Sequence, residues 1–387
     1  MMNIHHKKFN EIFNTPHEHS FFAPGRINLI GEHIDYSGGY VFPCALTFGT
    51  YAWVSRRSDQ KVALYSDNFS ELGVIEVDLS DLSYKKEHDW ANYPKGTLSM
   101  LEKRDLTLDH GLNIYYYGNI PNGAGLSSSA SIEMVTLWMV NQLFDFNLSL
   151  IDCALIGQET ENHYMGVNSG IMDQFAIGMG QENHAIYLNT DTLDYKMVPI
   201  DLGAHKIVIS NTNKRRGLAD SKYNERRAEC EEALSLLQTK ADITNLCDLE
   251  LNQFNEIKDV IKDEVILKRA RHAVSENERT KLATKVLSDN DLESFGKLMN
   301  ESHISLRDDY EATGIELDTL VEAAWQHPGT LGARVTGAGF GGCSIAIVKE
   351  EQVEDYIESL HKIYLDKIGY EATFYVASIG KGTFQID

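Results

Sequence analysis

Cysteines are few in this sequence, and they do not cluster. The 387 residues include five, widely spread, with no Cys-x-x-Cys pair and no group of cysteines and histidines at the spacing of zinc ligands. An odd number of scattered cysteines argues against the disulfide framework that is typical of small secreted domains. We therefore expect reduced, mostly buried thiols at Cys44, Cys153, Cys230, Cys247 and Cys343.

Long apolar runs are also absent. No segment approaches the roughly 18 uninterrupted apolar residues that a membrane-spanning helix needs. The N-terminus carries His5, His6, Lys7 and Lys8 but lacks the apolar core of about 7 to 15 residues that marks a secretory signal. These absences predict a soluble, cytoplasmic protein.

Positive charge is scarce. The chain has 35 lysines and arginines against 57 aspartates and glutamates, a formal charge of −22. Nucleic acids and anionic membranes would be repelled over most of such a surface, so neither is expected as a partner. A small anionic ligand would need local help from the residues around it.

The chain is long enough for two packed domains, since a typical domain has roughly 100 to 200 residues. Hydrophobic residues make up 43% of it, enough for a compact core. There is no Pro/Ser-rich linker and no repeat of fixed period, which favours two closely packed α+β domains. We place the boundary near residue 200, giving domains at 1–200 and 201–387.

Periodicity predicts mixed strands and helices in the first half and a second half that is richer in helix. The helix expected from Ser149 has an S-x-x-D start signal with Asp152. The expected helices are 128–144, 149–165, 219–238, 263–289, 291–306 and 315–326. The expected strands are 50–56, 61–67, 111–117, 185–189, 206–210, 344–348 and 373–378.

A glycine- and serine-rich turn, residues 121–131, follows an expected strand and opens an expected helix. Gly123 and Gly125 allow the backbone to approach a ligand closely, and the unpaired N–H groups of a helix start favour an anion. The turn matches neither G-x-x-x-x-G-K-[ST] nor G-x-G-x-x-G. From these residues alone it is either an anion site or a capped turn. A second glycine-rich stretch, residues 335–343, reads on its own as a tight turn.

Polar side chains are dense near the N-terminus, where Arg26, Glu32, His33 and Asp35 lie within ten residues bounded by glycines. Such a mixture of donors and acceptors suits a polyhydroxylated ligand, and the alternative is a solvated loop. Asp173 lies in a mostly apolar setting and is either a structural cap or a functional group, because burying an unpaired charge is costly. Glu161 by itself is an ordinary helical acid.

Together, residues 25–36, 121–131 and 336–342 resemble the three ordered motifs of the GHMP kinase superfamily. The first resembles the signature of the galactokinase family, whose Gly-Glu-His-x-Asp-Tyr segment mevalonate and homoserine kinases lack. The likeness extends through Asp173 and residues 211–230, and so covers essentially the whole chain. Ile34 stands where threonine is commoner, which leaves the neighbouring polar residues intact.

The resemblance implies an N-terminal domain similar to ribosomal protein S5 domain 2 and a ferredoxin-like C-terminal domain, with the site between them. It also implies which residues bind the substrates. The sugar would be bound by Glu32, His33, Ile34, Asp35, Gly170, Met172 and Tyr223. The nucleotide would lie near Ser66, its phosphates against Gly123, Ala124, Gly125, Leu126, Ser127, Ser128 and Ser129. Magnesium would be held by Ser129 and Glu161, which suits its preference for oxygen ligands.

The activity implied is transfer of the γ-phosphate of ATP to the C1 hydroxyl of galactose, with no obligate protein partner. Asp173 would face that hydroxyl, with Arg26 close enough to keep the carboxylate ionised. Two alternatives stay open: a sister enzyme acting on N-acetylgalactosamine or arabinose, and an inactive sugar sensor. The presence of Ser129-Ala130 favours an enzyme, because the best-known sensor of this kind lacks that pair.

Overall fold

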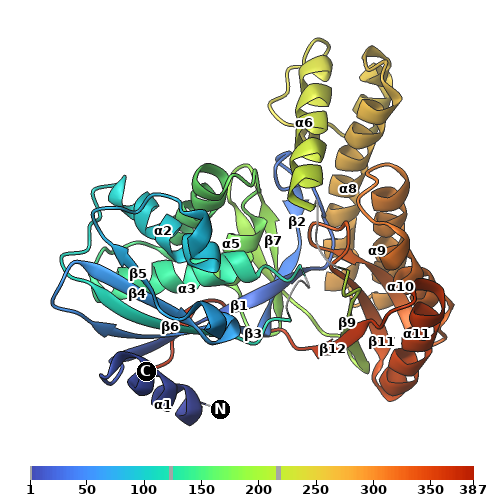
Figure 1. Ribbon diagram of the computed structural model, residues 1–387. Coiled ribbons are helices and arrows are strands. Elements are labelled where there is room, and N and C mark those ends of the chain that lie inside the picture. Colours follow the sequence, from blue (N-terminus) through green and yellow to red (C-terminus); the bar gives the residue numbers. More distant parts are fainter. Residues whose placement is uncertain (1, 122–124, 215–218) are drawn as a thin grey trace.

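The structure is a computed structural model that describes residues 2–121, 125–214 and 219–387. Figure 1 shows two lobes side by side, one built around a six-stranded sheet and the other around a four-stranded sheet. Two long helices, α6 (Ala219–Leu237) and α8 (Glu264–Ser288), rise together above them. No helix in the described ranges combines the length and the apolar character needed to cross a bilayer.

The strands in chain order are β1 (His19–Asn28), β2 (Tyr40–Val41), β3 (Pro43–Arg56), β4 (Lys61–Ser66), β5 (Ile75–Asp78), β6 (Leu112–Gly118), β7 (His184–Asn189), β8 (Tyr195–Pro199), β9 (His205–Asn211), β10 (Thr330–Thr336), β11 (Cys343–Lys349), β12 (Thr373–Ala377) and β13 (Phe384–Gln385). The other helices are α1 (Met2–Phe13), α2 (Asn92–Glu102), α3 (Ser128–Leu143), α4 (Leu150–Glu159), α5 (Met172–Met179), α7 (Leu251–Ile257), α9 (Leu292–Asp308), α10 (Ile315–Gln326) and α11 (Val353–Ile368).

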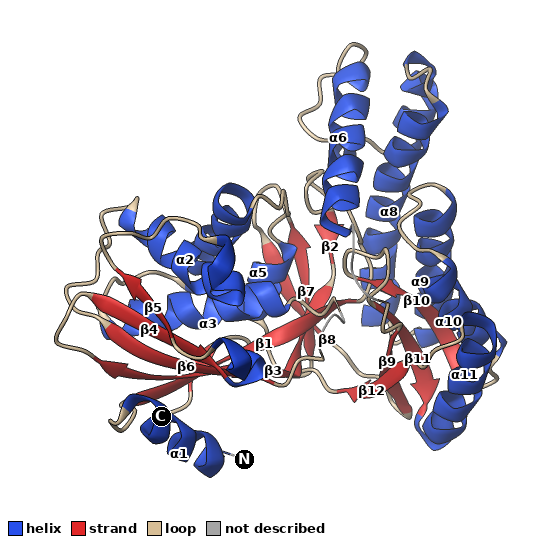
Figure 2. Cartoon of the chain, in the orientation of Figure 1, coloured by secondary structure: helices blue, strands red, loops and turns tan. Residues whose placement is uncertain are grey.

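The N-terminal sheet has the order β13-β1-β3-β6-β4-β5, with β4 and β6 parallel and the other pairs antiparallel. Helices α2, α3 and α5 lie over one face and α1 over the other (Figure 2). Side chains on a strand alternate between faces. Val54 and Tyr116 therefore enter the main core, while Trp53 and Tyr115 pack with Phe9 of α1. Both faces of the sheet are thus covered.

The C-terminal sheet is antiparallel, in the order β10-β11-β9-β12. Along β11, Ile345 and Ile347 pack in the core that includes α9, whereas Ala346 and Val348 pack in the core of α10 and α11. The order of elements is a strand, a group of helices (α6 to α10), two strands, a helix and a strand, which is that of a ferredoxin-like unit with several helices in place of the first one. The expected α+β fold class, with two lobes and a ferredoxin-like C-terminal unit, is confirmed.

The two lobes are joined by more than one crossing of the chain. After β12 the chain returns to the first lobe, where Ile379 bridges Leu46 and β13 pairs with β1. The N–H of Gly382 donates to the carbonyl of Gly180 at 2.7 Å, next to the end of α5. A division at residue 200 stays our proposal for the domains, and the last residues cross it.

Most long elements were expected from the sequence. The helix that begins after Ser149 is α4, and Ser149 and Asp152 form the reciprocal capping box. Strand β1 was not expected, because Pro24 and Gly25 make that stretch look like a loop. In the structure these residues coincide with a register shift between β1 and β3. Such bulges redirect side chains, and the next residue is Arg26.

Candidate active site

The three segments singled out in the sequence converge on one cleft between the lobes. Its walls come from β1 and the loop after it, the start of α3, the region from Glu161 to α5, α6, and the turn after β10. The cleft is lined by Arg26, Glu32, His33, Asp35, Tyr93, Pro121, Gly125, Leu126, Ser127, Ser128, Ser129, Glu161, Val167, Ser169, Gly170, Met172, Asp173, Tyr223, Gly337 and Ala338.

Arg26 and Asp173 form a two-pronged ion pair in this cleft. The Arg26 Nε donates to Asp173 Oδ1 at 2.7 Å and Nη2 donates to Oδ2 at 2.6 Å. The Arg26 side chain is almost fully buried, whereas 26% of the Asp173 side chain is exposed. A guanidinium matched to a carboxylate in this way is strong and directional. The pair thus places the Asp173 carboxylate on the open side of the cleft and the guanidinium behind it.

The start of α3 is attached to the same pair. Arg26 Nη1 donates to the carbonyl of Gly125 at 2.8 Å, and the N–H of Arg26 donates to the carbonyl of Leu126 at 3.2 Å. Ser127 Oγ donates to Asp173 Oδ2, and the Ser127 backbone is left-handed, with a φ of 61°. Ser128 and Ser129 form the first turn of α3, where unpaired N–H groups favour an anion. The expected contacts of Gly123 and Ala124 lie outside the described residues.

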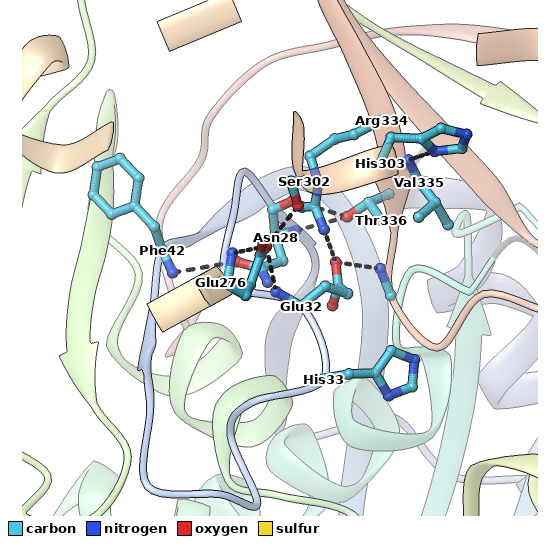
Figure 3. Close-up of polar contacts among 12 residues, drawn as sticks. Asn28, Glu32, His33, Phe42, Glu276, Ser302, His303, Arg334, Val335 and Thr336 are labelled. Carbon is cyan, nitrogen blue, oxygen red and sulfur yellow. Dashed lines mark hydrogen bonds and ion pairs between the residues drawn. The ribbon is translucent and has the colours of Figure 1, made fainter. Parts of the chain in front are cut away.

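Glu32 lines the cleft, and one of its carboxylate oxygens has two hydrogen-bond donors. Its Oε2 accepts from Arg334 Nη2 at 3.1 Å and from the N–H of Gly337 at 3.0 Å. In Figure 3 this oxygen is turned toward Arg334 and the other carboxylate oxygen points away from it. Burial raises the pKa of Glu32, and the charges of Arg334 and Arg26 act in the opposite direction.

His33 also lines the cleft, but the protein uses both of its ring nitrogens. Nε2 lies 3.0 Å from the carbonyl of Ala338, which can only accept, so Nε2 carries the proton. Nδ1 therefore accepts from the Tyr36 hydroxyl at 2.7 Å. Tyr36 accepts in turn from Tyr310 at 2.6 Å, and Tyr310 lies 3.2 Å from the thiol of Cys230. Burial lowers the pKa of His33 to about 3, so the ring is neutral.

Asp35 sits against the backbone of residues 170–172. The N–H of Met172 donates to its carboxylate. A Cβ atom on Gly170 would lie 2.2 Å from Asp35 Oδ2, so only glycine fits there. Burial, followed by repulsion from Asp173 and Glu32, raises the pKa of Asp35 to about 7.

Tyr223 and Ile34, the other two expected sugar contacts, lie in different places. Tyr223, on α6, lines the cleft beside His33, with ring centroids 5.3 Å apart. The side chain of Ile34 is fully buried in the core and is absent from the described lining of the cleft. Any contact of Ile34 with a sugar would therefore come from its backbone.

Glu161 faces Ser129 across the cleft. It lies in a π-helical turn, Thr160–Met165, that follows α4, a feature often found at functional sites. The Ser169 hydroxyl donates to Glu161 Oε2 at 2.6 Å, and Ser129 hydrogen-bonds to the same side chain. Burial raises the pKa of Glu161, with both hydroxyls acting against it. No cluster of three or more His, Cys, Asp or Glu side chains that could hold a metal occurs within the described ranges.

A second hollow adjoins the cleft and shares Tyr93, Ser128 and Ser129 with it. Ser66 lies at its base, at the end of β4, and Trp90 forms part of its wall. The expected nucleotide contact at Ser66 is therefore beside the start of α3.

Several buried polar residues at the site were missed in the sequence. Arg334 lies two residues before the Thr336-Gly337 of the third motif, a position that could have drawn attention to it. Glu133, on α3, is fully buried, and burial followed by repulsion from Glu161 raises its pKa well above the ordinary value. Gln174 donates to Glu133 at 3.1 Å. A glutamate within an apolar helix was visible, but its neighbours were not.

Comparison with known proteins decides the family. Three family models match: the galactokinase galactose-binding signature over residues 7–56, the GHMP kinases N terminal domain over 92–181 and the GHMP kinases C terminal over 282–365. A galactokinase of Lactiplantibacillus plantarum is 57% identical over 376 residues, 97% of both chains. One of Clostridium acetobutylicum is 55% identical over 387 residues, 100% of both chains. The chain belongs to the galactokinase family.

Solved structures agree. The galactokinase of Lactococcus lactis, crystallised with galactose, matches with a TM-score of 0.97 and 50% identity over 99% of both chains. A mevalonate kinase of Methanococcus jannaschii matches with a TM-score of 0.66 and 19% identity over 94% of this chain and 98% of its own, and shares the fold. As a galactokinase family member, the chain is an ATP-dependent sugar kinase.

The close approach of Gly170 to Asp35 generates a first prediction for this galactokinase-family chain. In Gly170→Ala the new methyl group would push Asp35 away, so the KM for the sugar should rise at least about tenfold while the KM for ATP stays unchanged. Gly166→Ala is the control, because a Cβ there meets nothing within 4 Å and the cost is limited to the left-handed backbone. Equal sugar KM values in the two variants would contradict the steric argument.

The raised pKa of Asp35 generates a second prediction, which concerns how stability depends on pH. Because the folded protein holds this proton more tightly than the unfolded chain, the stabilisation is complete below about pH 4 and is lost as the pH rises through about 7. Each pKa unit corresponds to about 1.4 kcal/mol, so the loss is at most about 4 kcal/mol. Between about pH 5 and pH 8, the melting temperature of the wild type should therefore fall relative to that of Asp35→Asn. Parallel curves from the two proteins would exclude Asp35 as the titrating group.

Proposed function

We propose that the chain transfers the γ-phosphate of ATP to the C1 hydroxyl of α-D-galactose, giving galactose 1-phosphate and ADP. The observation that carries the proposal is the Arg26–Asp173 pair. It lies in one cleft with the carboxylates of Glu32 and Asp35 and is bonded directly to the start of α3. A sugar on the carboxylate side would have a hydroxyl near Asp173, facing a phosphate held at α3.

The sugar side of the cleft supplies acceptors at fixed positions. In the proposal, Glu32 and Asp35 accept hydrogen bonds from sugar hydroxyls, Tyr223 contributes its hydroxyl, and the backbone at Gly170 and Met172 completes the pocket. His33 would contribute its backbone and its ring face, because both ring nitrogens are already bonded. The galactose bound in the Lactococcus lactis relative supports this choice of sugar.

The other side of the cleft supplies the nucleotide site. The first turn of α3 would receive the phosphates, at Gly125 to Ser129, and Gly123 and Ala124 are proposed to join them. The adjoining hollow, with Ser66 at its base, would take the remainder of the nucleotide. A net charge of −22 makes this local arrangement necessary, since ATP is itself an anion.

The donor set also fits magnesium. Ser129 and Glu161 offer a hydroxyl and a carboxylate next to the expected phosphates, and Mg²⁺ in such sites is usually held by one or two carboxylates together with phosphate oxygens and water. When bound, the ion would neutralise charge on the phosphates. We propose Ser129 and Glu161 as its protein ligands.

Catalysis in this proposal depends on position and charge. Asp173 orients the C1 hydroxyl and accepts its proton at or after a loose transition state. Arg26 and Ser127 donate three hydrogen bonds to the Asp173 oxygens, which hold the carboxylate in one position for this role. Arg26, bonded to Gly125 as well, holds the hydroxyl and phosphate sites at a fixed separation.

The cellular setting is part of the proposal. We place the enzyme in the cytoplasm, where ATP is available, with galactose and ATP as its partners. Burial of all five cysteines is compatible with a reducing compartment.

The test is ADP release with galactose, N-acetylgalactosamine, arabinose, glucose and mevalonate, each with and without magnesium. Galactose with magnesium should give the highest kcat/KM. A preference for another sugar would reassign the substrate, and no turnover with any of them would indicate an inactive sensor.

Asp173→Asn should lower kcat at least about 100-fold, because the proton acceptor and the charge facing Arg26 are lost. Galactose should still bind, measured by calorimetry without ATP, since Glu32 and Asp35 remain. Asp201→Asn, which removes an exposed carboxylate from a turn, is the control and should be indistinguishable from wild type. Turnover close to wild type in Asp173→Asn would refute the assigned role.

Glu161→Gln should raise the magnesium concentration needed for half-maximal rate at least about fivefold, because the carboxylate ligand becomes an amide. Glu133→Gln is the matched control. That neighbouring carboxyl is buried against Gln174 and is not part of the described lining of the cleft, so its magnesium titration should not move. Identical titrations of Glu161→Gln and wild type would remove Glu161 from the ligand set.

A further inference from the structure

The backbone of the sugar-binding loop rests on a buried acid from the other lobe. Glu276, on α8, is fully buried, and its Oε1 accepts from the N–H of Gly31 at 3.0 Å and of Glu32 at 3.3 Å. Ser302 on α9 donates to the same oxygen at 2.5 Å. Figure 3 shows these groups gathered around the Glu276 carboxylate. Two successive peptide N–H groups directed at one oxygen form an anion-binding arrangement of the backbone.

The acid is charged. Burial alone would raise its pKa, but the positive charges nearby, that of Arg279 foremost and that of Arg334 as well, overcome that effect and lower the pKa of Glu276 to about 2. Arg279 Nη1 donates to Glu276 Oε2 at 2.9 Å. An ionised acceptor makes shorter and stronger hydrogen bonds to the two N–H groups than a neutral one would.

Other contacts from the C-terminal half hold the rest of Glu32. His272, one helical turn before Glu276, donates from Nε2 to the carbonyl of Glu32 at 3.0 Å, and its Nδ1 lies 2.8 Å from the Ser305 hydroxyl. Burial lowers the pKa of His272 to about 4, so the ring is neutral, with its proton on Nε2. With Arg334 on the carboxylate, the N–H, the carbonyl and the side chain of Glu32 all have a partner from this half of the chain.

We propose that Glu276 is a positioning residue for galactose recognition, acting through the backbone of Glu32. The inference rests on the proposed function and names a residue of α8 as part of the support for the sugar pocket. Gly31 has a φ of 90°, a conformation open to glycine but rarely to other residues, and its N–H is directed at Glu276 there. Glu276 holds the loop at the residue whose carboxylate lines the cleft.

The proposal predicts an effect on one substrate only. The start of α3 is attached to Arg26 and Asp173, and those contacts do not include α8. Loosening the Gly31–Glu32 backbone should therefore weaken galactose binding and leave the nucleotide side intact. A merely structural role would lower stability and the amount of active enzyme without separating the two KM values.

The experiment compares Glu276→Gln with Glu278→Gln. The second variant removes a carboxylate two residues along α8 that accepts from the N–H of Leu251 at 2.7 Å, away from the cleft. For Glu276→Gln we expect the galactose KM, and the galactose Kd measured by calorimetry without ATP, to rise at least about tenfold, with the ATP KM within about twofold. Glu278→Gln should keep both KM values.

Ser302→Ala provides a milder variant in case Glu276→Gln does not fold. It removes one donor to Glu276 Oε1, and we expect a rise in galactose KM of about threefold with unchanged ATP KM. Unchanged galactose KM in the folded variants, or equal changes for galactose and ATP, would overturn the proposal. Absence of galactose phosphorylation by the wild type would refute the proposed function instead, so the two failures are distinguishable.

Discussion

Four carboxylates lie in one cleft, and much of the architecture serves to stabilise them there. Glu32, Asp35, Glu161 and Asp173 all line the same space. Like charges in a poorly solvated site repel one another and also lose hydration, so each needs compensation. Asp173 has Arg26, Glu32 has Arg334, Asp35 has a peptide N–H and a raised pKa, and Glu161 has two hydroxyls. The partners come from both lobes, which ties the active site to the way the lobes are assembled.

Different compensation gives the four acids different properties. Arg26 holds Asp173 fixed relative to the start of α3. Asp35, with a pKa near 7, changes its average charge around neutral pH. The partners of Glu161 are two neutral hydroxyl groups, those of Ser169 and Ser129, which a bound cation could replace. These differences cannot be predicted from the position of each acid in the chain, because they depend on the groups that contact its carboxylate in the fold.

The sequence predicted those features whose residues lie close together in the chain or belong to a recognisable motif. The start of α3, the loop from Arg26 to Asp35 and the helix at Ser149 were predicted because capping residues, glycines and close polar spacing are local signals. Strand β1 was missed because Pro24 and Gly25 hide a bulged strand. Glu276 and Arg334 were missed for another reason: the role of each depends on a contact with Glu32, which is 244 positions from Glu276 and 302 positions from Arg334. A single sequence without its fold carries no signal for such pairings.

The last strand, β13, pairs with β1, the first strand of the chain. During synthesis the ribosome releases the N-terminal end first, and domains usually begin to fold in that order. Here the edge of β1 that faces β13 stays unpaired until the chain of the second lobe has been made, whereas its other edge can pair with β3 soon after synthesis of that strand. Completion of the N-terminal sheet therefore waits for the second lobe, although the first lobe is made before it.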